Sequence, residues 1–419
     1  MLASAPPDLA QLVIDRKPGH TLDGPFYTSK AIFDADVDLI FSRHWIFVAV
    51  EPEIAEAGDY VTINVGPHSV IIMRDDNMVV AAFHNVCRHR GSRLINEERG
   101  FVGNIVCPYH QWTYNLEGAL IHAESMGKGF DPTCYSLKKV HVRSVAGLIF
   151  ICLAKDAPTD FEAMAQAMTP YLAPHNIPQL KIAKQIDLVE NGNWKLTMEN
   201  NRECYHCGGH PELSQTFFKI YATRPEDVTD AERGDYEHYQ NAMAEFKTIW
   251  QRANLPYAAI EKLDGTPTGY RTERLALDKA GESYSLDTKA ACKKLTGEYG
   301  TARLGTLHFH TQPNSWHHFL SDHAVTFSVL PLAPDRTLVR TTWMVHKDAV
   351  EGVDYNVDNL TLVWKATNQQ DCDFVEYTQR GVGSPAYEPG PYSGPEYQVN
   401  LFANWYIERL AEHLGITHG

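Results

Sequence analysis

Two short segments of the chain each pair a cysteine with a histidine. Cys87 and His89 are separated by one residue, Cys107 and His110 by two, and 17 residues lie between the two pairs. Thiolate sulfur and imidazole nitrogen both bind transition metals. Two cysteines and two histidines can hold a tetrahedral zinc ion. The same set can hold a two-iron two-sulfur cluster, with the cysteines on one iron and the histidines on the other.

A second group of candidate ligands lies in the segment that ends at His210. If this segment is a helix, Glu203, His206 and His210 fall within an arc of about 60°. Two imidazoles four residues apart on one helix face can bind one metal ion. A zinc protease of the His-Glu-x-x-His type needs a glutamate directly after the first histidine, where this chain has Cys207. Hydrolysis by that mechanism therefore lacks its base.

The same segment contains the motif Cys204-x-x-Cys207. Attachment of a c-type haem requires a histidine directly after the second cysteine, and residue 208 is a glycine. We therefore expect neither cysteine to be a metal ligand.

A carboxylate beside two histidines would complete the facial triad of a non-haem Fe(II) site. Residues 354–380 have the pattern of one long helix, and Asp371 lies in the middle of its apolar stripe. The stripe consists of Val357, Leu360, Trp364, Thr367, Phe374 and Val375. A buried carboxylate needs a cation as partner, so Asp371 is a candidate metal ligand. Asp373 points about 160° away from this stripe, toward solvent, and is the weaker candidate. The alternative for Asp371 is a buried salt bridge, and the alternative for His206 and His210 is a pair of hydrogen-bonded core histidines.

Two kinds of structure must position these candidate ligands. From Trp45 to about residue 155, short β-branched runs alternate with turn residues, which is typical of a small antiparallel sandwich. Helix and strand patterns mix afterwards, and residues 323–346 predict a β-hairpin. We therefore expect an α+β fold in three parts: residues 1–40 as an arm that packs on the last part, 41–155 as a β domain, and 156–419 as a larger domain.

Composition excludes several classes of partner. The 419 residues include 37 Lys plus Arg and 52 Asp plus Glu, a net charge of −15, so nucleic acid is not expected. The longest apolar run, Val145–Ala154, is about half of what a bilayer requires, and the N-terminus lacks the pattern of a signal peptide. No membrane partner is expected. Eight cysteines are too few for a disulfide scaffold, which favours the reducing cytoplasm with thiols available for metal.

The residues around the first group, NVCRHRGSRL and CPYHQWTYNLEG, resemble the Rieske cluster motif. Together with ENNRECYHC and QQDCDFVEYTQRG, they make the whole chain resemble the α subunit of a Rieske non-haem iron oxygenase. The resemblance implies an antiparallel β Rieske domain and a helix-grip catalytic domain, in which a central antiparallel sheet wraps a long C-terminal helix. It implies a [2Fe-2S] cluster on Cys87, His89, Cys107 and His110, and a mononuclear Fe(II) on His206, His210 and Asp371.

The resemblance also implies a role for Glu203. In this family, an acidic residue three positions before the first histidine connects the iron site with the cluster of a neighbouring subunit, which implies a homotrimer. Most ring-hydroxylating members have aspartate there, and many have four residues between the histidines, where this chain has three. Glu203 and the following HPEL resemble most closely the branch that acts on quaternary ammonium compounds, such as glycine betaine, proline betaine and carnitine.

The resemblance therefore implies a small cationic methylated amine as substrate. A quaternary ammonium group has no N–H to donate, so aromatic faces are expected to hold it. Phe309 and Trp316 are predicted for this role, because HFHTQPNSWHHF mixes aromatic residues with histidines. His308 and His310 share one face of an expected strand, and one of them is a candidate for binding the substrate carboxylate.

The implied reaction is oxidative N-demethylation, with O2 as co-substrate and formaldehyde as a product. No glycine-rich dinucleotide fingerprint opens a βαβ unit, so NADH and flavin are expected only on a separate flavin/iron–sulfur reductase. Three alternatives remain: an aromatic ring-hydroxylating dioxygenase that forms cis-dihydrodiols, a non-catalytic iron–sulfur electron carrier, and a zinc-binding structural protein.

Overall fold

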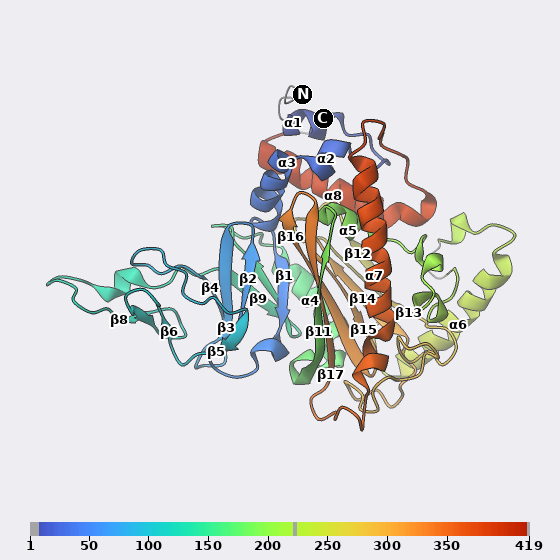
Figure 1. Ribbon diagram of the computed structural model, residues 1–419. Coiled ribbons are helices and arrows are strands. Elements are labelled where there is room, and N and C mark those ends of the chain that lie inside the picture. Colours follow the sequence, from blue (N-terminus) through green and yellow to red (C-terminus); the bar gives the residue numbers. More distant parts are fainter. Residues whose placement is uncertain (1–7, 221–223, 417–419) are drawn as a thin grey trace.

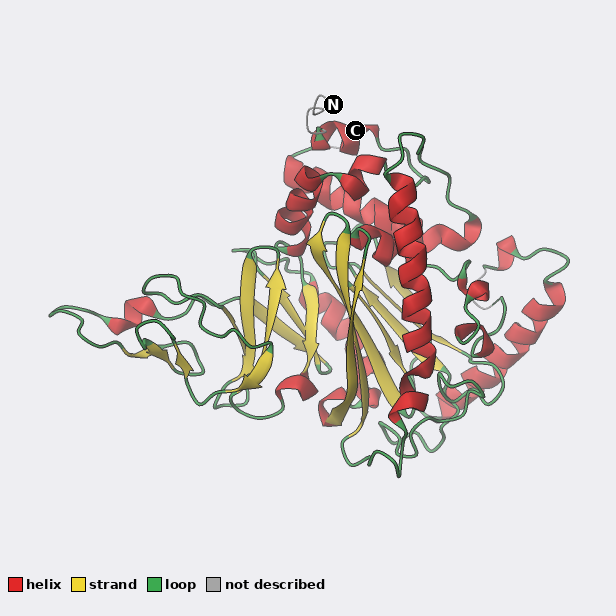
Figure 2. Cartoon of the chain, in the orientation of Figure 1, coloured by secondary structure: helices red, strands yellow, loops and turns green. Residues whose placement is uncertain are grey.

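A computed structural model of the chain describes residues 8–220 and 224–416. The chain forms a β-rich N-terminal part beside a larger part, in which helices cover a seven-stranded sheet (Figures 1 and 2). Helix α4 (Phe161–Leu172) follows the last strand of the first part. In the described part of the chain, no helix has both the length and the apolar character needed to cross a bilayer.

The N-terminal part contains three antiparallel sheets, as the alternation of β-branched runs and turns predicts. The first sheet has the order β1 (Ile46–Val50), β10 (Leu148–Cys152) and β9 (His141–Val145). The second has the order β4 (Val80–His84), β3 (His68–Arg74), β2 (Asp59–Val65) and β5 (Arg99–Phe101). The third has the order β6 (Ile105–Val106), β7 (Thr113–Tyr114) and β8 (Leu120–His122).

The larger part is built on one antiparallel sheet. Its order is β11 (Leu180–Glu190), β17 (Arg336–His346), β16 (His323–Ala333), β15 (Ser315–Phe319), β14 (Thr306–Thr311), β13 (Tyr270–Leu275) and β12 (Ile260–Lys262). The hairpin predicted at 323–346 is confirmed, because β16 and β17 pair directly across the turn at Pro334 and Asp335. The α+β fold expected from the sequence is therefore confirmed.

Helix α7 (Val357–Val382) is the long helix that the apolar period predicts. It begins where the Asn356 side chain accepts a hydrogen bond from the Asn359 N–H, which satisfies one of the unpaired donors of the first turn. The helix lies along the sheet and contacts β11 and α5 (Trp194–Asn200) (Figure 1). Helix α7 also contacts the short turn Leu213–Gln215, in the segment that follows α5.

The N-terminal helices pack on the same part of the molecule. They are α1 (Leu9–Asp15), α2 (Gly24–Thr28) and α3 (Lys30–Ala35). Helix α8 (Tyr397–Leu414), from the other end of the chain, packs against α1. Asp36 forms a fully buried ion pair with Lys195 of α5 and accepts a hydrogen bond from Tyr406 of α8 at 2.6 Å. These contacts hold α5 between the N-terminal segment and α8. Helix α6 (Arg233–Arg252) lies at the edge near β13 (Figure 1).

Burial keeps six histidines neutral in the folded chain, and this gives its stability a pH dependence. Burial lowers the pKa of His44, His175, His308, His310, His317 and His318. In the unfolded chain these groups take up protons below about pH 6.5, so acid favours unfolding by up to about 1.4 kcal/mol per proton and pH unit. Glu190 and Glu199, whose pKa burial raises to about 7, act in the opposite direction but are fewer.

We therefore expect the melting temperature to fall continuously between pH 6.5 and 4, measured by calorimetry at a fixed scan rate. The variant His44→Gln should show a shallower decline, because burial lowers the pKa of His44 to about 3 and the variant removes this group from the proton balance. Identical slopes for the variant and the wild type would contradict the role of buried histidines.

Candidate functional site

Cys87 and Cys107 occupy equivalent positions in two loops. One loop follows β4, and the other connects β6 to β7. In each loop the cysteine N–H bonds to the carbonyl five residues later, and the cysteine carbonyl accepts the N–H of the residue four positions later. That residue, Gly91 or Gln111, has a positive φ in both loops. The two loops therefore present their cysteines on matching backbone turns.

The four side chains of these loops divide by burial. Cys87 and Cys107 are 3% and 1% exposed, whereas His89 and His110 lie at the surface with ring centroids 4.6 Å apart. The buried Trp112 ring stacks flat on His89 at 4.8 Å. Two sulfur and two nitrogen donors fit a [2Fe-2S] cluster with the thiolates inside and the imidazoles outside.

The segment 201–210, which carries the second group of ligands, is irregular rather than helical. Helix α5 ends at Asn200, and a single 3-10 turn follows at Cys207–Gly209. The prediction that Glu203 and the two histidines share one helical face is therefore wrong. Two consecutive glycines and a nearby proline disfavour a continued helix, because glycine has high backbone entropy and proline lacks the N–H donor.

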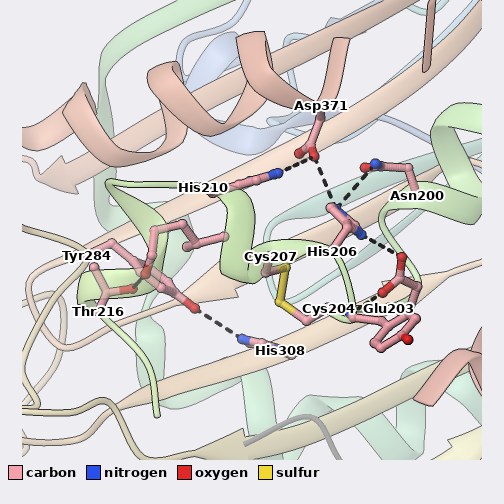
Figure 3. Close-up of a disulfide and its surroundings, with 12 residues drawn as sticks. Asn200, Glu203, Cys204, His206, Cys207, His210, Thr216, Tyr284, His308 and Asp371 are labelled. Atoms are coloured by element: carbon pink, nitrogen blue, oxygen red, sulfur yellow. Dashed lines mark hydrogen bonds and ion pairs between the residues drawn. A yellow bond between two sulfur atoms is a disulfide. The ribbon is translucent and has the colours of Figure 1, made fainter. Parts of the chain in front are cut away.

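The irregular segment nevertheless brings His206 and His210 to Asp371 of α7 (Figure 3). The Oδ1 atom of Asp371 lies 3.3 Å from Nε2 of His206 and 3.4 Å from Nε2 of His210. The candidate ligand atoms of the three residues all lie within 4.8 Å of one another. Asp373 is exposed, as the helical pattern predicts.

The surroundings of His210 fit a bound metal ion. Its side chain is fully buried; within the described ranges its Nδ1 has no hydrogen-bond partner, and its Nε2 has only the 3.4 Å contact with Asp371. A buried polar group without a partner is unfavourable, and coordination of Fe(II) would satisfy it. The donor set of two imidazoles and one carboxylate is the one that non-haem Fe(II) sites use.

Glu203 orients the first histidine. Its Oε1 lies 2.5 Å from Nδ1 of His206, and Asn200 lies 3.3 Å from Nε2 on the other side of the ring. Burial lowers the pKa of His206, but hydrogen bonds to Asp371 and Glu203 outweigh it and raise that pKa to about 10. Without metal, the imidazole is thus a cation between two carboxylates. A metal cation would take the place of the proton on Nε2, and the same two carboxylates would support its charge.

Cys204 and Cys207 form a disulfide beside the triad (Figure 3). The sequence predicts that some thiols are available, and the other six cysteines are free. A sulfur atom in a disulfide offers no thiolate, which agrees with the expectation that these residues are not metal ligands. The bridge closes a short loop around Tyr205 and His206 and restricts the backbone there.

A cavity of about 210 Å³ adjoins the triad. The carboxylates of Glu203, Glu273 and Asp371 and the rings of Trp364 and Tyr397 contribute to its lining. It therefore combines negative charge with aromatic surface next to the candidate metal site.

Phe309 and Trp316, which the sequence predicts to hold the substrate, do not contribute to the lining of this cavity. Successive residues of a strand face opposite sides, and His308 and His310 of β14 occupy the cavity side. Phe309 is fully buried on the other face and packs near His317. Trp316 stacks on Phe327 at 4.8 Å inside the core.

Several cavity residues were missed from the sequence. Trp364 lies two turns before Asp371 on the same face of α7, so the period that identified Asp371 contained the signal for Trp364. Tyr397 comes from α8 and Arg202 from the irregular segment. No local pattern marks either of them, since only the packing of α8 and the path of that segment bring them to the cavity.

Both parts of the chain match known families. Residues 44–144 match the Rieske [2Fe-2S] domain, and residues 178–412 match the catalytic domain of ring hydroxylating alpha subunits. The glycine betaine monooxygenase oxygenase subunit of Chromohalobacter salexigens is 40% identical over 416 residues, which cover 99% of this chain and 91% of that protein. The carnitine monooxygenase oxygenase subunit of Escherichia coli K12 is 34% identical over 200 residues, 47% of this chain and 54% of that protein.

Solved structures share the fold. The quaternary ammonium Rieske monooxygenase CntA with L-carnitine aligns with a TM-score of 0.68 at 22% identity and covers 96% of this chain and 98% of its own. Naphthalene 1,2-dioxygenase from a Rhodococcus species aligns with a TM-score of 0.65 at 18% identity, with coverage of 96% and 98%. The two family matches and the relative at 40% identity show that this chain belongs to the Rieske non-haem iron oxygenases, as an oxygenase subunit.

Proposed function

We propose that this chain removes an N-methyl group from a quaternary ammonium betaine, such as glycine betaine or proline betaine. The observation that carries the proposal is the relative at 40% identity across 99% of this chain, which is named a glycine betaine monooxygenase subunit. A naphthalene 1,2-dioxygenase component from Pseudomonas aeruginosa aligns over only 45% of this chain. The cavity supports the proposal, since carboxylates and aromatic rings stabilise a cation that has no N–H donor.

In this proposal, His206, His210 and Asp371 hold a mononuclear Fe(II) beside the cavity. A facial triad leaves coordination positions open, and the ion supplies the oxygen-activating chemistry there. Glu203 accepts the hydrogen bond from Nδ1 of His206, which leaves Nε2 for the metal and fixes the ring plane. The carboxylates of Glu203 and Asp371 would offset the charge of the ion, so that it repels the cationic end of the substrate less.

The proposed reaction is balanced by an external reductant. One oxygen atom of O2 enters a C–H bond of an N-methyl group, and the other leaves as water, with two electrons and two protons consumed. The N-hydroxymethyl ammonium product then breaks its C–N bond and gives formaldehyde, the tertiary amine and a proton.

The electrons reach this chain from a separate NADH-dependent flavin/iron–sulfur reductase. The cluster ligands Cys87, His89, Cys107 and His110 hold the group that stores one electron at a time. The sheet of β6, β7 and β8 lies at the far end of the N-terminal part from α7 (Figure 1). We therefore propose a homotrimer, in which Glu203 receives the electron from the cluster of a neighbouring subunit.

A second candidate function is aromatic dihydroxylation to cis-dihydrodiols. The naphthalene 1,2-dioxygenase component from Pseudomonas aeruginosa, 34% identical over 199 residues, favours it. The fold alone does not separate the two functions, because function depends on the residues of the cavity.

The products separate the two functions directly. We expect the holoenzyme with a reductase and NADH to consume O2 and release formaldehyde with glycine betaine or proline betaine, in a panel with carnitine, choline and naphthalene. Diol formation from naphthalene without formaldehyde from any betaine would contradict the proposed function and support the second candidate.

Replacement of Asp371 by alanine should remove one iron site and leave the other. We expect iron to fall from about three to about two atoms per chain, while the visible absorption of the cluster is retained, because its ligands lie in another part of the chain. Asp373 lies two residues away but is exposed. The matched control Asp373→Ala should therefore keep about three iron atoms per chain. Unchanged iron in Asp371→Ala would remove this residue from the ligand set.

Replacement of Glu203 by glutamine should separate metal binding from electron delivery. We expect product in a single turnover of the reduced holoenzyme to fall by at least about 10-fold, with both metal centres still bound, and Glu203→Asp to retain part of the yield. A normal single-turnover yield in Glu203→Gln would exclude this carboxylate from the electron path.

A further inference from the structure

Arginines as well as carboxylates line the cavity beside the triad, and two of them already have carboxylate partners. Arg271 pairs with Glu261 at 2.9 Å and with Glu273 at 2.5 Å. Arg224 pairs with Asp227 at 3.1 Å. Their positive charges are therefore neutralised by the protein itself.

Arg202 also lines the cavity, and its charge is not neutralised. The residue is 1% exposed and donates hydrogen bonds only to neutral acceptors: His310 Nδ1 at 3.0 Å, the Thr311 carbonyl at 3.3 Å and Gln312 Oε1 at 2.8 Å. Its Nε–H has no partner within the described ranges. A buried cation without a counter-ion is unfavourable, and burial together with Arg271 lowers the pKa of Arg202 to about 9.

His310 extends this group of donors. Because a guanidinium group can only donate, Nδ1 of His310 must be the acceptor, and the neutral ring carries its proton on Nε2. Burial and the charge of Arg202 hold the pKa of His310 well below its ordinary value. None of the residues in the described ranges accepts a hydrogen bond from this Nε2–H. Arg202 and His310 thus combine positive charge with unused donors in one wall of the cavity.

We propose that Arg202 and His310 form the subsite that binds the carboxylate of a zwitterionic betaine. The proposal rests on the proposed function and deepens it, because it names the residues that select a substrate with an anionic group. A carboxylate would accept a charge-assisted hydrogen bond from Arg202 and a second hydrogen bond from His310, and it would neutralise the buried cation. Choline has the same trimethylammonium group but a hydroxyl in place of the carboxylate, so it would leave Arg202 without a counter-ion.

The other charges of the cavity give the bound zwitterion an orientation. Glu203 follows Arg202 directly in the chain, and Asp371 belongs to the triad; both line the same cavity. An ammonium group placed against the rings of Trp364 and Tyr397 and a carboxylate placed against Arg202 would bring an N-methyl group toward the triad. There, Asp371 and Glu203 would offset the charge of the ion. A substrate with a positive charge alone lacks the second of these contacts.

The test compares glycine betaine with choline by calorimetric titration of the oxidised holoenzyme without a reductant. We expect the wild type to bind glycine betaine at least about 10-fold more tightly than choline. Arg202→Gln should weaken glycine betaine binding by about 10- to 100-fold, the usual effect of losing a hydrogen bond to a charged group, and should not weaken choline binding. Arg202→Lys, which keeps a point charge without the planar fork, should lie between.

The matched control is Arg224→Gln, which removes another cavity arginine whose charge is paired with Asp227. It should keep the wild-type preference for glycine betaine. Equal glycine betaine affinity in the wild type and Arg202→Gln would overturn the proposal. If Arg202→Gln fails to fold or loses its metals, His310→Leu decides, since an unchanged preference for glycine betaine in that variant overturns the proposal and a lost preference supports it.

Turnover by the wild type distinguishes failure of the subsite from failure of the proposed function. Formaldehyde released from choline as efficiently as from glycine betaine would reject the carboxylate subsite and keep N-demethylation. No formaldehyde from any quaternary ammonium compound in the panel would reject the proposed function itself.

Discussion

The contact of Asp371 with His206 and His210 is the interaction on which the candidate metal site depends. It joins segments 165 residues apart, the irregular chain after α5 and the middle of α7. The contact forms because α7 packs along β11 and α5, and because the Asp36–Lys195 ion pair and Tyr406 hold α5 from the other side. A substitution that disturbs any of these contacts would therefore displace one of the candidate ligands as well as lower the stability of the fold.

Some of the unsatisfied polar groups line the cavity beside this contact. Buried polar groups in folded proteins almost always have hydrogen-bond partners, yet within the described ranges Arg202, His210, His318 and Trp364 each have a buried nitrogen without a hydrogen bond and line the same cavity. Such groups lower stability when nothing is bound. A metal ion and a polar substrate in the cavity would supply partners for some of these nitrogens and recover that free energy.

The two metal sites differ in how much of their construction is local. The candidate cluster ligands of each loop lie within four residues, and each loop repeats the same turn around its cysteine, so spacing alone was enough to propose them. Asp371 was predicted from the apolar period of a long helix, and the structure has this helix as α7. The helix expected at 201–210 was wrong, because the glycines, the disulfide and the proline interrupt the backbone while the three side chains still converge.

Residue types and spacing by themselves predicted the two candidate ligand sets, and they determined the antiparallel β part, the 323–346 hairpin and the long helix. These follow from local periodicity and from the fixed chemistry of sulfur, imidazole and carboxylate donors. Only the tertiary structure decided which residues line the cavity, and it placed Trp364 and Tyr397 there instead of Phe309 and Trp316. The physical reasons are that strand alternation turns Phe309 to the other face of the sheet, and that Trp316, on the same face as His310, packs on Phe327 in the core. The residues that line the cavity are therefore set by neighbours distant in the chain.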